Sequence, residues 1–158
     1  MPKLSYHINC LPIIENYYFY YLVSVIVLMN LDGCFGCNIP QACIPVGFEK
    51  FTADLSAIWA IIIELRAGQP TILRATDIYN PLVAEWKRCD IFTACDTCWG
   101  NMSDAARKAA EIYNIPFLSR YDTFDGQDHS EDPREKGYIR DDGEHPNEAA
   151  SQFTAELL

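Results

Sequence analysis

Residues 142 to 147 read Asp-Gly-Glu-His-Pro-Asn and place an acid and an imidazole three residues apart. An imidazole can act as a general base when a carboxylate fixes its tautomer and stabilises the imidazolium that forms. Asp142 and His145 are therefore the candidate acid and base of a hydrolytic site. Without further context, a helix-capping aspartate beside an incidental histidine is the more common arrangement.

The cysteines offer a second kind of chemistry, because Cys34 with Cys37 and Cys95 with Cys98 have CxxC spacing. Four thiolates could hold one tetrahedral zinc ion, but the separation of the two pairs is far longer than in usual zinc ribbons. A redox pair should open a helix that follows a strand, and Cys95 and Cys98 precede a predicted helix. Disulfides or buried thiols are favoured for the seven cysteines, which are Cys10, Cys34, Cys37, Cys43, Cys89, Cys95 and Cys98.

A run of acids near His129 raises the alternative of a calcium-stabilised loop, but its spacing does not follow the EF-hand pattern. We expect no metal and no cofactor. His129 and His7 have no catalytic context and are predicted to be surface residues. The acids of this run are Asp122, Asp125, Asp128, Glu131 and Asp132.

The elements that must position these residues alternate between strand and helix. Residues 23–29 are apolar and β-branched, as in a strand buried on both faces of a parallel sheet. Apolar residues recur at helical spacing over 48–65, and Gly68 with Pro70 ends that helix. Residues 71–78 return to strand composition, which completes a βαβ unit and predicts a parallel sheet.

The C-terminal half continues the alternation. Ser103 and Asp104 supply a helix start before residues 105–113, and residues 115–118 form a short strand. A long polar loop is predicted over 121–142, followed by a helix over 146–158 with an apolar stripe. His145 thus lies where the last helix begins. Loops beyond the carboxyl ends of parallel strands are where α/β proteins place their sites.

Together with this setting, the Asp-x-x-His block resembles the last conserved block of the SGNH/GDSL serine ester hydrolases, chiefly bacterial lipases and esterases. Residues 132–150 look like the loop and closing helix of that family. Residues 75–81 (Ala-Thr-Asp-Ile-Tyr-Asn-Pro) and 37–43 (Cys-Asn-Ile-Pro-Gln-Ala-Cys) are also similar, so the resemblance covers about two-thirds of the chain. It implies one α/β domain over residues 1–158, with a three-layer flavodoxin-like fold and a parallel sheet flanked by helices.

The resemblance also implies a reaction. A catalytic serine would attack a small ester, with Asp142 and His145 completing the triad. The family's oxyanion donor corresponds to Asn30, although Leu28 replaces the family's glycine there and Leu31 is inserted after it. The Gly-Asp-Ser block of the nucleophile is missing, and only Ser5 and Ser24 precede Asn30. Residues 1–20 match nothing in the family, so the fold is predicted to lack its first strands.

The composition of the chain limits the kinds of partner that it is expected to bind. A formal net charge of −10 disfavours nucleic acid. The uncharged run 17–29 is too short to span a membrane, since a spanning helix needs about 20 apolar residues.

The resemblance favours an exported protein, yet no clear signal peptide is visible. An exposed sheet edge could pair in a homodimer. The alternative function is an inactive α/β module that binds an acyl or glycan ligand.

Overall fold

The computed structural model describes residues 45–158, with side chains from Phe48 onward. The predicted strand over residues 23–29 and the site candidates Ser5, Ser24 and Asn30 lie outside the described residues. The helices and strands, in chain order, are α1 (Pro45–Leu65), β1 (Ala75–Thr76), α2 (Val83–Arg88), α3 (Phe92–Glu111), β2 (Phe117–Leu118), α4 (Arg120–Asp125) and α5 (Glu148–Leu157).

The two strands form a small parallel sheet, in which Ala75 pairs with Phe117 and Thr76 with Leu118. Parallel strands need a crossover connection, and here α2 and α3 supply it. This mixture of helices with a parallel sheet agrees with the predicted α/β class. Both strands are shorter than predicted, because only two residues of each are paired within the described part of the chain.

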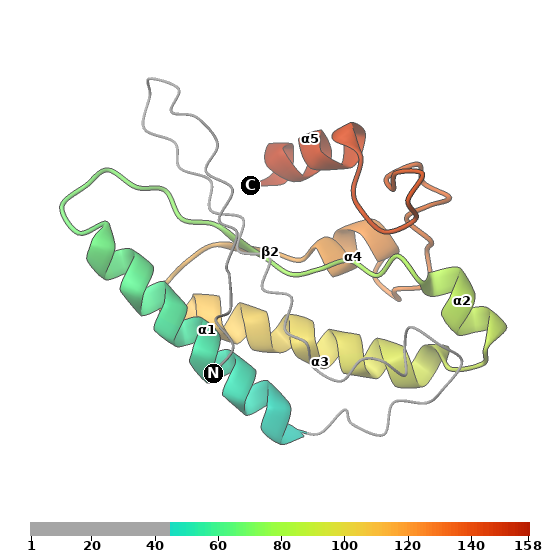
Figure 1. The fold of residues 1–158 in the computed structure, drawn as a ribbon, viewed down its shortest axis with the longest axis horizontal. Coiled ribbons are helices and arrows are strands. Elements are labelled where there is room, and N and C mark those ends of the chain that lie inside the picture. Colours follow the sequence, from blue (N-terminus) through green and yellow to red (C-terminus); the bar gives the residue numbers. More distant parts are fainter. Residues whose placement is uncertain (1–44) are drawn as a thin grey trace, which may run out of the picture.

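Helix α1 confirms the helix predicted over residues 48–65. Phe51, Leu55 and Trp59 follow one another at a spacing of four residues and are buried, so they form one face. That face packs against α3, and the two helices lie side by side in Figure 1. The apolar stripe ends sooner than the sequence suggested, because Leu65 is 70% exposed.

Helix α3 is much longer than the predicted helix over residues 105–113. The predicted start at Ser103 and Asp104 is wrong, since both residues lie well inside the helix, as do Cys95 and Cys98. The helix begins at Phe92 because its first half also carries buried apolar residues, Cys95, Cys98 and Trp99, which continue the apolar stripe of the second half. The buried residues of the stripe in the second half are Met102, Ala106 and Ala109.

The C-terminal part of the chain covers the other side of the strands. In Figure 1, α5 lies across the strands from α1 and α3. Ala150 of α5 packs with Tyr79 and Phe124 in a second, smaller apolar cluster. Helix α5 begins at Glu148, two residues later than predicted, because the Asn147 side chain caps it by accepting the Ala150 N–H at 3.0 Å. Helix α4 occupies the start of the predicted loop over residues 121–142.

Candidate active site

The structure brings Asp142 and His145 together. His145 Nδ1 lies 3.2 Å from Asp142 Oδ2, while Asp142 Oδ1 accepts the backbone N–H groups of Glu144 and His145, each at 2.9 Å. The hydrogen bonds from these two N–H groups lower the pKa of the Asp142 carboxyl, which favours its charged form. The His145 side chain is 68% exposed, so the imidazole is open to solvent.

A tight hairpin carries the two residues. Ile139 and Pro146 form an antiparallel bridge, and the Arg140 N–H donates to the His145 carbonyl at 2.9 Å. Gly143 has a φ of 78°, a conformation that costs glycine little and other residues more. Its N–H closes the turn on the Arg140 carbonyl at 2.9 Å. The backbone of the hairpin thus fixes the position of Asp142 relative to His145.

Two side chains from other segments hold this hairpin, and neither was predicted from the sequence. The Tyr79 hydroxyl donates to the Glu144 carbonyl at 2.6 Å. Arg134 Nε donates to the Gly143 carbonyl at 3.2 Å, and its guanidinium pairs with Glu85 at 2.7 Å. Tyr79 follows the last residue of β1 by three positions. The hairpin is therefore attached just beyond the carboxyl end of β1 through Tyr79.

A buried carboxyl group, Asp77, accepts four hydrogen bonds at the same end of the strands. It is 4% exposed and accepts the backbone N–H groups of Arg120 at 2.5 Å and Tyr121 at 3.1 Å. It also accepts the hydroxyl groups of Ser103 and, at 2.8 Å, Ser119. Burial raises the pKa of Asp77, and the four hydrogen bonds oppose that shift. Since both hydroxyls donate to Asp77, neither serine is arranged as a nucleophile for His145.

His129, which was predicted to be a surface residue, is partly buried and contacts two carboxylates. Its Nδ1 lies 2.7 Å from Asp96 and its Nε2 lies 3.0 Å from Asp122. The ring stacks on Tyr121 at 3.8 Å between centroids, and its side chain is only 20% exposed. Burial lowers the pKa of His129, but the two carboxylates outweigh it and raise the pKa. Asp122 belongs to the acidic run near His129 in the sequence, whereas the contact with Asp96 has no local signal because Asp96 lies 33 residues away.

The acidic run that suggested calcium is dispersed among separate partners. Asp125 is fully buried and accepts the Asn80 N–H at 3.0 Å, whereas Asp128 bonds Ser130 and Glu131 pairs with Lys136. Within residues 45–158, no group of three or more His, Cys, Asp or Glu side chains is arranged to hold a metal ion. None of the helices in the same range is long and apolar enough to cross a membrane.

The cysteines in the described range are oxidised. Cys89, Cys95 and Cys98 are all disulfide-bonded, which agrees with the disulfides favoured from the sequence. A sulfur in a disulfide is not available as a thiolate ligand. The CxxC pair of α3 is therefore unsuited to a zinc site in this state.

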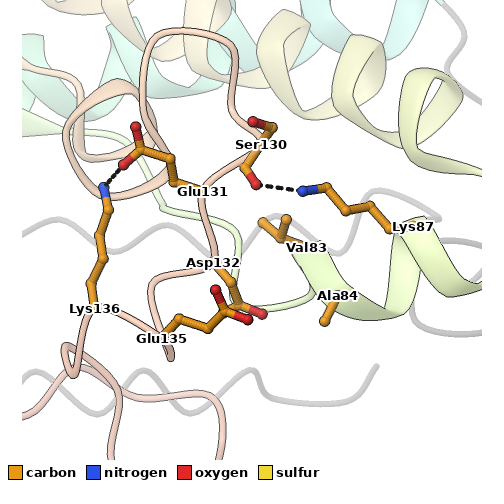
Figure 2. A pocket seen from close by; sticks show the side chains of 8 residues that line it. All are labelled: Val83, Ala84, Lys87, Ser130, Glu131, Asp132, Glu135 and Lys136. Carbon is orange, nitrogen blue, oxygen red and sulfur yellow. Dashed lines mark hydrogen bonds and ion pairs between the residues drawn. The ribbon is translucent and has the colours of Figure 1, made fainter.

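A hollow of about 440 Å³ lies between α2 and the loop that follows α4. Figure 2 shows Lys87 reaching the Ser130 carbonyl across it, at 2.7 Å, and Lys136 paired with Glu131. Both lysines are thus engaged by groups of the protein itself. Asp142 and His145 do not line this hollow, and both side chains are exposed to solvent.

Comparisons of the chain with known protein families, with curated proteins and with solved structures found no significant match.

Proposed function

We propose that this chain is a carboxylic ester hydrolase that works by Ser-His-Asp acyl transfer, with Asp142 and His145 as its acid and base. The observation that carries the proposal is the 3.2 Å contact between the two side chains, in a hairpin attached just beyond the carboxyl end of β1. The resemblance of this segment to the SGNH/GDSL hydrolases supports it. The finer fold that we propose is the three-layer flavodoxin-like arrangement of that family.

The reaction follows from the orientation of the imidazole. Nδ1 faces Asp142, which leaves Nε2 of His145 for the substrate side. A serine hydroxyl would attack the ester carbonyl and pass its proton to His145, which returns a proton to the leaving alcohol. Water would then release the acid by the same route. Ser5 and Ser24 are the candidates for the nucleophile, and Asn30 is the candidate oxyanion donor.

Hydrolysis of short-chain p-nitrophenyl esters by the purified chain tests the proposal. His145→Ala should lower kcat by about a thousandfold or more, as removal of a triad base does elsewhere. Asp142→Asn should also be strongly impaired. Asp141→Asn is the matched control, because it makes the same chemical change in the neighbouring exposed residue and should retain full activity.

A fluorophosphonate probe, read by mass spectrometry, identifies the nucleophile in the same samples. One labelled serine together with His145-dependent turnover supports a serine hydrolase and identifies its nucleophile. Turnover that survives His145→Ala would reject the proposed mechanism. An unlabelled and inactive chain would favour the alternative, a module that binds an acyl or glycan ligand without hydrolysing it.

A further inference from the structure

We propose that Tyr79 is the positioning residue of the Asp142 and His145 pair, acting through the peptide group that joins Glu144 to His145. The effect on hydrolysis rests on the proposed function, whereas the effect on the geometry of the pair does not.

One peptide group links Tyr79 to Asp142, because its carbonyl and its N–H each form one of the two hydrogen bonds. Its carbonyl, on Glu144, accepts the Tyr79 hydroxyl at 2.6 Å, and its N–H, on His145, donates to Asp142 Oδ1 at 2.9 Å. Hydrogen bonds in such a chain polarise and strengthen one another. The Tyr79 hydroxyl therefore fixes the plane of this peptide, and the peptide in turn orients the carboxylate that faces His145.

Tyr79 is itself held firmly, which an anchor requires. It is 4% exposed, its ring lies 5.0 Å from that of Phe124, and the Arg120 guanidinium lies 5.5 Å from the ring centre. Burial raises the pKa of Tyr79 to about 12. The hydroxyl thus remains protonated, and able to donate, throughout the neutral range.

By contrast, the pair that Tyr79 supports is exposed, with 45% of the Asp142 side chain and 68% of the His145 side chain open to solvent. Exposed side chains in a loop are free to adopt other rotamers unless neighbouring groups restrain them. The Asp142 carboxylate is restrained by the N–H groups of Glu144 and His145. Tyr79 restrains the peptide between those two residues from its carbonyl side.

Tyr79→Phe keeps the buried ring and removes only the donor. The largest of the hydrogen bonds that lower the pKa of Asp142 comes from the His145 N–H, which belongs to the peptide group that Tyr79 holds, and loosening that peptide weakens it. The pKa of Asp142 should therefore rise toward its ordinary value in Tyr79→Phe. In the proposed reaction, kcat should fall about tenfold with little change in KM, because the buried Tyr79 acts through the Glu144 carbonyl.

Carbon-13 NMR titration of the Asp142 carboxyl in the full chain measures this effect. Tyr138→Phe is the matched control, because its ring packs on Phe124 in the same cluster, also at 5.0 Å. A rise in the pKa of Asp142 in Tyr79→Phe, with none in Tyr138→Phe and an unchanged Tm, supports the inference. An unchanged pKa in Tyr79→Phe overturns it.

Should Tyr79→Phe fail to fold, the unmodified chain decides the matter. The Tyr79 hydroxyl proton should then give a slowly exchanging resonance with a nuclear Overhauser contact to Glu144 or His145, and a freely exchanging hydroxyl would reject the inference. A chain that shows the Asp142 effect but hydrolyses no ester would retain Tyr79 as a positioning residue and reject the hydrolase function.

Discussion

Asp125 is a carboxyl group with no exposed surface, which favours its protonated form. One oxygen accepts the Asn80 N–H at 3.0 Å, and the other has no hydrogen-bond partner among the described residues. Burial raises the pKa of Asp125 to about 8. The folded chain should therefore bind a proton here that the unfolded chain has already released at neutral pH.

This difference predicts that the free energy of unfolding falls as the pH rises from about 4 to about 8. Each unit of difference between the folded and unfolded pKa corresponds to about 1.4 kcal/mol. Asp125→Asn, which resembles the protonated acid in shape, should flatten the dependence and stabilise the chain at pH 8. Urea unfolding at several pH values measures this. An equally steep profile in the variant would show that Asp125 is not the responsible group.

His129 should give the free energy of unfolding a second dependence on pH, which a variant of His129 would detect. Its folded pKa is raised, so its contribution is fully present below pH 6.5 and is lost as the pH rises through the folded value. His129→Gln should destabilise the chain by about 1 kcal/mol at pH 5.5, the size of a partly exposed ion pair. The loss should shrink at pH 8.5. Asp96→Asn should reproduce this profile if the imidazolium pairs with Asp96.

At the scale of single residues, the sequence predicted the contact between Asp142 and His145 because the two lie close along the chain. It did not identify Tyr79, which reaches the same hairpin from 65 residues away. The contact of His129 with Asp96 was missed for the same reason, because Asp96 lies 33 residues away. Spacing within one segment is readable from sequence, whereas contacts between distant segments depend on packing that no local pattern encodes.

At the scale of elements, α5 depends on its first turn. Asn147 caps the helix with its side-chain oxygen and also donates from Nδ2 to the Gly137 carbonyl at 2.6 Å. Asn147→Ala should therefore lower the free energy of unfolding by about 1 kcal/mol or somewhat more. Thermal unfolding measures the loss. Ala155→Gly, in the exposed last turns of the same helix, tests whether helix propensity alone has a comparable effect.

The helices also show why some elements were predictable. Helix α1 has an uninterrupted apolar stripe, and its predicted and observed ends nearly coincide. The first half of α3 contains Thr93, Thr97 and Gly100, residues of low helix propensity. Its apolar stripe is instead formed largely by cysteine, tryptophan and methionine, whose burial in the core outweighs that low helix propensity. The strands were predicted too long because pairing, rather than composition, determines where a strand ends.

At the scale of the whole molecule, the disulfides are expected to raise the free energy of unfolding. Cys89, Cys95 and Cys98 are disulfide-bonded, and each bridge typically stabilises a protein by about 2–4 kcal/mol. Adding a phosphine reductant should lower the Tm, and the three residues should resist iodoacetamide until the reductant is present. Peptide mapping measures this protection, and alkylation of Cys95 in the unreduced, folded chain would contradict it.

The carboxyl group of Asp77 has a consequence for how the folded chain opens. It joins the end of β1 to the middle of α3 and to the first turn of α4, so its four donors come from segments that meet only in the complete fold. Local fraying cannot expose the Arg120 and Tyr121 amides while these segments stay assembled. Their hydrogens should exchange with deuterated solvent only as fast as this whole βαβ unit comes apart.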